Sequence, residues 1–204
     1  MRNLSHLYRI QRKYAQAEAF LTQVAEVQQR VLGSEHPDTL TTMTDMAQLC
    51  LDQRKYGQAD RLSATVLEVR RRVLGEGHPD TVSALVSLGQ VRLEWRRYAE
   101  AESLLHDALR IQEKNAPDAW QRYNTQSLLG ASLAAQAKFS EAEPLLLAAH
   151  RGLLERENTI PFENRSSVEQ AGNRIIEMYQ KSGKPEQASV WIERLHPASA
   201  KRIP

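Results

Sequence analysis

A short pattern, Lys/Arg-Tyr followed three residues later by Ala and then Asp/Glu, recurs along the chain at a fixed spacing. Its tyrosines are Tyr14, Tyr56 and Tyr98, which are separated by 42 residues each time. Weaker copies place Phe139 and Pro185 at the tyrosine position, after further steps of 41 and 46 residues. Self-similarity with a period of tens of residues is the signature of a repeat fold, in which each unit is one small supersecondary element. The period therefore constrains the architecture more than any single motif does.

A second marker keeps the same spacing. The segment Gly33–Thr39 returns 42 residues later as Gly75–Thr81, and a shortened version survives at Asn115–Asp118. Proline fixes φ at a helix start, and an acidic side chain suits the first turn, so the Pro-Asp pairs predict helix starts. The histidines before the first two pairs, His36 and His78, also suggest a metal or acid–base site, but zinc needs about four converging ligands and each repeat supplies one. The helix-start interpretation accounts for the recurrence.

Apolar residues between the markers repeat with the period of amphipathic helices, so each unit is predicted to be a helix pair. Small side chains recur at one position of the second helices, where a larger side chain would hold two helices apart. These residues are Ala17, Ala59, Ala101, Ala142 and Ala188. The pattern never switches to the alternation of a strand. We therefore expect an all-α fold with at least nine helices in antiparallel pairs and no sheet.

These repeats resemble the tetratricopeptide repeat, and the 42-residue period with its Leu-Gly-x-x-His-Pro-Asp linker is similar to the kinesin-light-chain subtype. The resemblance implies a right-handed α-solenoid of about five helix-turn-helix units, the first of them truncated, in a single array over residues 1–204. The implied units are roughly 1–35, 36–77, 78–115, 116–160 and 161–196, followed by a tail at 197–204. Such a fold specifies function much less than it specifies structure.

The resemblance also implies that the first helices line a concave partner-binding groove. The candidate groove residues, taken by position, are Asn3, His6, Arg9, Thr44, Asp45, Gln48, Asp52, Ser87, Gln90, Glu94, Ser127, Asn173 and Glu177.

The Lys and Asn constellation with which chaperone-binding relatives clamp a terminal carboxylate is absent, since Thr44 and Gln48 stand at its positions in the second unit. Kinesin light chains place an Asn in successive first helices, and this chain keeps Asn3 but has Asp45, Ser87 and Leu128 at the later positions. The family's cargo specificity therefore does not transfer.

Composition and motifs exclude several classes of function. Lys and Arg total 27 against 25 Asp and Glu, and this net charge of +2 provides no footprint for nucleic acid. The single cysteine, Cys50, permits no disulfide within the chain, and no apolar run approaches the length that crosses a membrane. No nucleophile–base pair or Gly-rich phosphate loop is found, so we expect no enzyme activity, cofactor or metal. With no secretory signal, the cytoplasm is the expected location.

We expect a non-catalytic protein-interaction module whose groove binds a peptide or protein segment. The alternative is a scaffold, oligomerisation or regulatory segment of a larger signalling protein such as a bacterial kinase, because related arrays often accompany kinase domains and this chain starts inside a first helix. Self-association through uncapped ends is a further expectation, since no repeat covers Trp191 and Ile192 or the outer side of the helix from Met1 to Arg12. A bent final helix with Trp191 tucked inward is the competing interpretation.

Basic pairs occupy the same turn in three units, namely Arg12-Lys13, Arg54-Lys55 and Arg96-Arg97. The family usually has glycine in this turn. Exposed turns are commonly solvated by charged residues, and the nearby Asp52, Asp60 and Glu94 would neutralise much of the field. An edge that binds an acidic partner is the other interpretation.

Overall fold

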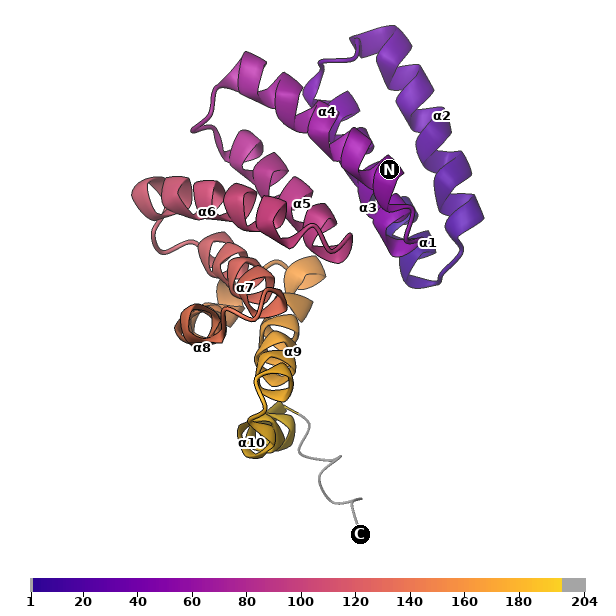
Figure 1. Ribbon diagram of the computed structural model, residues 1–204. Helices are drawn as coiled ribbons and strands as arrows, with labels where there is room; N and C mark the ends of the chain where they lie inside the picture. The colour runs from indigo at the N-terminus through magenta and orange to yellow at the C-terminus, as the bar shows by residue number, and fades with distance from the viewer. Residues whose placement is uncertain (1, 196–204) are drawn as a thin grey trace. The chain divides into compact units, whose positions relative to one another are not determined.

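The computed structural model describes residues 2–195, with side chains from residue 4 onward. Ten α-helices and no strand are found in this described part of the chain (Figure 1). The chain forms two compact units, Met1–Arg97 and Tyr98–Pro204. The predicted all-α fold with at least nine helices is therefore confirmed, whereas the division into five repeats of one array stays a prediction, and the tail at 197–204 lies outside the described residues.

The first unit contains five helices, each packed against the next. They are α1 (Arg2–Ile10), α2 (Tyr14–Leu32), α3 (Pro37–Asp52), α4 (Tyr56–Leu74) and α5 (Pro79–Glu94). The first helix of each pair is α1, α3 or α5, and α3 also contacts α5 directly. At 9 residues α1 is shorter than α3 and α5, which have 16 each.

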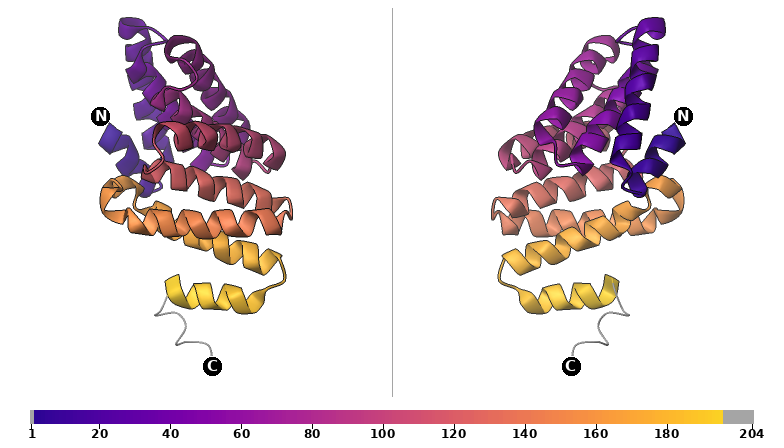
Figure 2. Two further views of the ribbon diagram at one scale, coloured as in Figure 1. Left: turned by 90° about the vertical axis from the view of Figure 1, so that its left-hand side faces the viewer. Right: turned by 90° about the vertical axis from the view of Figure 1, so that its right-hand side faces the viewer.

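The second unit also contains five α-helices, and α7 contacts α9 as well as its chain neighbours. They are α6 (Tyr98–Asn115), α7 (Trp120–Ala135), α8 (Phe139–Glu155), α9 (Ser166–Lys181) and α10 (Pro185–Leu195). Figure 2 shows α9 and α10 as an antiparallel hairpin. Two 3₁₀ turns, η1 (Glu157–Thr159) and η2 (Phe162–Asn164), lie between α8 and α9.

Histidine side chains cap the starts of α3 and α5. Nδ1 of His36 accepts a hydrogen bond from the Asp38 backbone N–H over 3.2 Å, and Nδ1 of His78 accepts from the Asp80 backbone N–H over 3.1 Å. A proline occupies the first turn in both helices. These contacts satisfy a backbone donor that has no partner within the helix. The Pro-Asp helix starts are confirmed, and both histidines act as caps.

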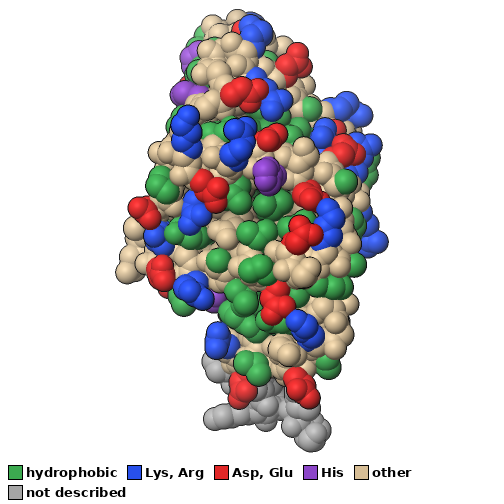
Figure 3. Space-filling model, turned by 60° about the vertical axis from the view of Figure 1, so that its left-hand side comes forward, with side chains coloured by type: hydrophobic (Ala, Val, Ile, Leu, Met, Phe, Trp, Pro, Cys, Tyr) green, Lys and Arg blue, Asp and Glu red, His purple; other side chains and the backbone are tan. Residues whose placement is uncertain are grey.

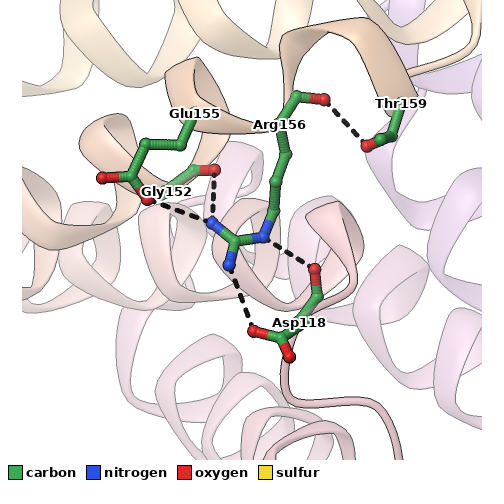
Figure 4. Close-up of polar contacts among 5 residues, drawn as sticks. All are labelled: Asp118, Gly152, Glu155, Arg156 and Thr159. Atoms are coloured by element: carbon green, nitrogen blue, oxygen red, sulfur yellow. Dashed lines mark hydrogen bonds and ion pairs between the residues drawn. The ribbon is translucent and has the colours of Figure 1, made fainter.

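The third Pro-Asp pair, Pro117-Asp118, does not open a helix. The next helix, α7, begins two residues later, at Trp120. The Asp118 carbonyl accepts a hydrogen bond from Nε of Arg156 over 2.8 Å, and its carboxylate lies 3.1 Å from Nη2 of the same side chain (Figure 4). Nη1 of Arg156 also donates to the Gly152 carbonyl. Arg156 thus ties Asp118 to the end of α8, and the helix start moves two residues past it. The prediction of a helix start at Asn115–Asp118 is wrong for this reason.

The turns that join first and second helices share one backbone conformation. Each contains one residue with positive φ: Arg12 (55°), Arg54 (59°), Arg96 (62°), Ala137 (61°) and Gly183 (73°). The N–H of the following residue bonds back across five residues, as in Lys55 to the Cys50 carbonyl over 2.8 Å. This arrangement is the Schellman ending, which satisfies the last carbonyls of a helix and favours glycine at the left-handed position.

Small residues lie where helices approach most closely. The recurring alanines Ala17, Ala59, Ala101 and Ala142 are fully buried. A Cβ added to Gly130 of α7 would stand 2.7 Å from Cγ of Leu146 on α8, which is closer than van der Waals contact allows. The predicted close packing of paired helices through small residues is therefore present in the structure.

Candidate partner-binding face

In the first unit the candidate groove residues lie on α1, α3 and α5. The partly buried ones are Arg9, Thr44, Asp45, Gln48, Ser87 and Gln90, and the exposed ones are His6, Asp52 and Glu94. The side chain of Asn3 lies outside the described residues. Polar side chains of three first helices are thus accessible from solvent within this unit.

Three of these residues form a hydrogen-bonded network between α1 and α3. Nε of Arg9 donates to Oδ2 of Asp52 over 2.7 Å, and Nε2 of Gln48 donates to Oδ1 of the same carboxylate over 3.2 Å. Charge-assisted bonds of this kind are short and hold both partners in place. The structure therefore brings Arg9, Gln48 and Asp52 together, as a pre-ordered polar group on the face of the first helices.

Two hydroxyls of the candidate face are turned toward their own helices. Oγ1 of Thr44 donates to the Leu40 carbonyl over 2.9 Å, and Oγ of Ser87 donates to the Ser83 carbonyl over 2.9 Å. Each hydroxyl has one proton to donate, so it offers a ligand only the acceptor lone pairs that remain.

In the second unit the candidates are divided between α7 and α9. Ser127 has 0% of its surface exposed, and its Oγ accepts a hydrogen bond from Nη1 of Arg174 over 3.0 Å. Asn173 is partly buried and Glu177 is exposed. Ser127 therefore orients the partly buried Arg174 instead of facing solvent. Position within the repeat points to both residues, and the structure shows that the two side chains bond to each other.

Ion pairs link successive copies of the Lys/Arg-Tyr motif. The acid that ends one copy pairs with the lysine that begins the next copy. Nζ···O distances are 3.3 Å for Lys55–Glu18, 2.8 Å for Lys138–Glu102 and 2.8 Å for Lys184–Glu143. Amide or phenol groups join the same acids, as when Tyr179 donates to Glu143 over 2.9 Å. The sequence carried a signal for these pairs, because a lysine and an acid five residues later recur together in the marker.

The pKa values of these acids follow from the pairing. The hydrogen bond from Lys138 lowers the pKa of Glu102, and that from Lys184 lowers the pKa of Glu143. Burial, together with the hydrogen bond to Glu143, raises the pKa of Tyr179. Each shift favours the protonation state that the ion pair or hydrogen bond requires. The marker residues thus connect neighbouring repeats.

The side chains that commonly bind metals or act as nucleophiles are dispersed. Among the described residues, no three His, Cys, Asp or Glu side chains form a group that could hold a metal ion. Burial raises the pKa of the Cys50 thiol, which reduces its thiolate character. Lys/Arg and Asp/Glu side chains are intermingled over the face drawn in Figure 3. No helix within residues 2–195 is both long and apolar enough to cross a membrane.

The side chain of Trp191, on α10, is partly buried. The Trp191 ring meets the His150 ring edge-on, with centroids 5.0 Å apart, and the Arg194 guanidinium carbon lies 4.7 Å from the Trp191 centroid. Ile192 is also partly buried, while Val190 is 57% exposed. His196 and the residues after it lie outside the described part of the chain. Self-association through this end stays a prediction.

Comparison with known proteins agrees with the architecture. The family model for the tetratricopeptide repeat matches residues 1–64 and 46–114, which together exceed half of the chain. A search of curated proteins finds no match.

Three solved structures illustrate the fold. A Podosopora anserina protein described as a kinesin light chain with nearly identical TPR-like repeats has 23% identity and a TM-score of 0.73, over 98% of this chain and 93% of that one. BtubC (BKLC) from P. vanneervenii has 15% identity and a TM-score of 0.72, over 97% and 78%. YrrB, a TPR protein with an unusual peptide-binding site, has 15% identity and a TM-score of 0.52, over 98% and 90%. Because the family model covers more than half of the chain, the chain belongs to the tetratricopeptide repeat family.

Proposed function

We propose that the chain is a non-catalytic protein-interaction module, located in the cytoplasm, that binds an extended peptide or protein segment along its first helices. Membership of the tetratricopeptide repeat family supports an interaction role in general. The observation that carries the specific proposal is the network of Arg9, Gln48 and Asp52, which places polar groups of two successive first helices at one accessible position. The structural neighbour YrrB has a peptide-binding site, which is in keeping with this role.

The network leaves hydrogen-bonding capacity for a ligand. Arg9 bonds to Asp52 through Nε, and its two terminal nitrogens make no further bond among the described residues. Guanidinium N–H groups are suited to the carbonyl or carboxylate oxygens of a peptide, and the Gln48 carbonyl is suited to its N–H groups. Because the side chains are already ordered, less entropy is lost when a segment binds.

The test uses peptides selected on the purified chain from a random-sequence display library. Their Kd is then measured by fluorescence anisotropy for the chain, for Arg9→Ala with Gln48→Ala, and for the control Gln16→Ala with Gln29→Ala, whose side chains are exposed on α2. We expect the first double variant to weaken binding at least about tenfold and the control to leave it unchanged. Equal Kd values for the two double variants, or a failure to enrich any peptide, would contradict the proposal.

A scaffold or oligomerisation role within a larger signalling protein is the second candidate. It is favoured by apolar side chains on α1, where Leu4 is 40%, Leu7 47% and Ile10 67% exposed. Light scattering at high protein concentration separates the candidates. Self-association that is lost in Leu7→Glu with Ile10→Glu, or in Trp191→Glu with Ile192→Glu, supports the scaffold role, and a monomer at all concentrations argues against it.

A further inference from the structure

Three arginines of the first unit stand at the same place in successive turns. Arg12, Arg54 and Arg96 follow the first helices α1, α3 and α5, and all three side chains are exposed. Each has the left-handed backbone conformation, with φ between 55° and 62°. The corresponding turns of the second unit carry Ala137 and Gly183, so this turn forms without arginine.

The arginines are not explained by the fold. A residue with a Cβ is disfavoured in the left-handed region, where glycine is the better choice. The negative end of the helix dipole favours a cation, but Lys13 and Lys55 already supply one in the adjacent position. Ala137 has the same conformation in the second unit, so the backbone alone does not require arginine. Arginine at three successive exposed turns therefore points to a role for these side chains outside the fold.

Most of the acids near these turns bond to other side chains. Asp52 bonds to Arg9 and Gln48, and Asp60 bonds to Nε of Arg92 over 3.0 Å. Glu18 pairs with Lys55. Within the described residues no carboxylate pairs with Arg12, Arg54 or Arg96, and Glu94 stays exposed near Arg96. These acids therefore do not neutralise the turn arginines as the sequence suggested, and the edge keeps an excess of positive charge.

We infer that this edge, formed by Arg12, Arg54 and Arg96, binds an extended acidic segment of a partner protein. Each guanidinium donates two N–H bonds to one carboxylate, a geometry that arginine provides and lysine does not. Packed helices lie about 8–10 Å apart, and an extended chain advances about 3.3 Å per residue. The matching segment therefore carries an acidic residue at roughly every third position. The edge consists of residues other than Arg9, Gln48 and Asp52, so the inference does not depend on the groove.

A protein segment fits the edge better than a nucleic acid does. Duplex DNA carries a charge about every 1.7 Å along its axis, and proteins that bind it neutralise many phosphates at once. This chain has a net charge of only +2, and Glu94 would repel a continuous run of phosphates. Carboxylates spaced along a peptide can meet the arginines and avoid the remaining acid.

The experiment measures binding of a fluorescein-labelled ten-residue peptide with glutamate at every third position and Gly-Ser between. The test variant combines Arg12→Gln, Arg54→Gln and Arg96→Gln. The matched control combines Arg30→Gln, Arg61→Gln and Arg110→Gln, which removes the same charge from exposed helical positions. A third variant replaces the turn arginines by lysine. A single-stranded oligothymidylate and vesicles containing phosphatidylserine serve as competing anionic probes.

We expect the turn variant to weaken peptide binding at least about tenfold and the control less than about twofold, with the lysine variant in between. A peptide of the same composition with contiguous glutamates should bind more weakly than the spaced one. Equal effects of the two glutamine variants, no peptide binding at about 50 mM salt, or tighter binding of the oligonucleotide or vesicles than of the peptide would overturn the inference. Circular dichroism checks that all variants keep their helices.

Discussion

The ring of Tyr123 on α7 lies directly against the backbone of Gly152 on α8, so closely that a Cβ at residue 152 would stand 2.0 Å from Cδ1 of the ring. Two guanidinium groups stack on the same ring: the central carbons of Arg122 and Arg156 lie 4.0 and 4.5 Å from its centroid. Arg156 is in turn the residue that holds Asp118 (Figure 4). Glycine at 152 is therefore a packing requirement of the second unit.

Gly152→Ala should destabilise the chain, because the added methyl group must displace the Tyr123 ring or separate the two helices. Overpacking of this kind costs about 1–3 kcal/mol. Gly57→Ala is the matched control, since a Cβ there meets nothing within 4 Å. It should stabilise α4 by up to about 1 kcal/mol. Urea unfolding measures both changes, and similar values for the two variants would show that Tyr123 moves away without cost.

Arg54→Gly should stabilise the chain. A side chain in the left-handed conformation costs about 1–2 kcal/mol, while the greater entropy of unfolded glycine offsets about 0.4–1 kcal/mol. We therefore expect a net gain of about 0.5–1 kcal/mol. Arg54→Ala removes the charge and keeps the Cβ, so it should bring no such gain. A stabilisation that is equal in the two variants would assign the effect to charge instead of backbone conformation.

The repeat period was sufficient to predict the fold. It indicated helix pairs, the starts of α3 and α5, and the burial of Ala17, Ala59 and Ala101, because these depend on local propensity and on contacts that recur in every unit. The start of α7 was not predictable in this way, since Asp118 is held by Arg156, which lies 38 residues away along the chain.

The sequence predicts which residues lie on the first helices, but it does not predict which of their side chains are exposed. The repeat period places Ser127 on a first helix. In the structure the packing of α7 against α9 buries its side chain, which accepts a hydrogen bond from Arg174. Likewise, the sequence placed Asp52 and Asp60 near the basic turns, whereas side-chain reach decided that they bond to Arg9 and Arg92. Contacts between helices that are distant in sequence decide which polar groups remain accessible, and a single sequence does not specify them.

His78→Ala should destabilise the chain by about 0.5–2 kcal/mol, because it removes the acceptor for the Asp80 backbone N–H. His78→Asn should cost much less, since asparagine is a good N-cap. Thermal unfolding of the two variants provides the comparison. An alanine variant as stable as the asparagine variant would mean that water replaces the cap.

Ala142→Leu should destabilise the second unit by about 1–3 kcal/mol through overpacking, because Ala142 is fully buried beside the close contact of Gly130 with Leu146. Ala99→Leu, at an exposed position of α6, is the control and should change stability by less than about 0.5 kcal/mol. The free energy of unfolding in urea distinguishes them, and an unchanged value for Ala142→Leu would contradict the close approach of α7 and α8.

His150 should make the stability of the chain depend on pH near neutrality. Burial, and to a smaller extent the Arg194 charge, lowers the pKa of this histidine. The unfolded chain, with a histidine pKa of about 6.5, therefore takes up the proton first. The stabilisation is complete above that pH and is lost as pH falls through the lower folded-state pKa.

We expect the free energy of unfolding to decrease from pH 7.5 to pH 5 more steeply in the wild type than in His150→Phe, which retains an aromatic ring against Trp191. His106→Gln, at an exposed position, should retain the wild-type slope. Parallel curves for the wild type and His150→Phe would mean that His150 protonates in place, with Trp191 and Arg194 moving aside.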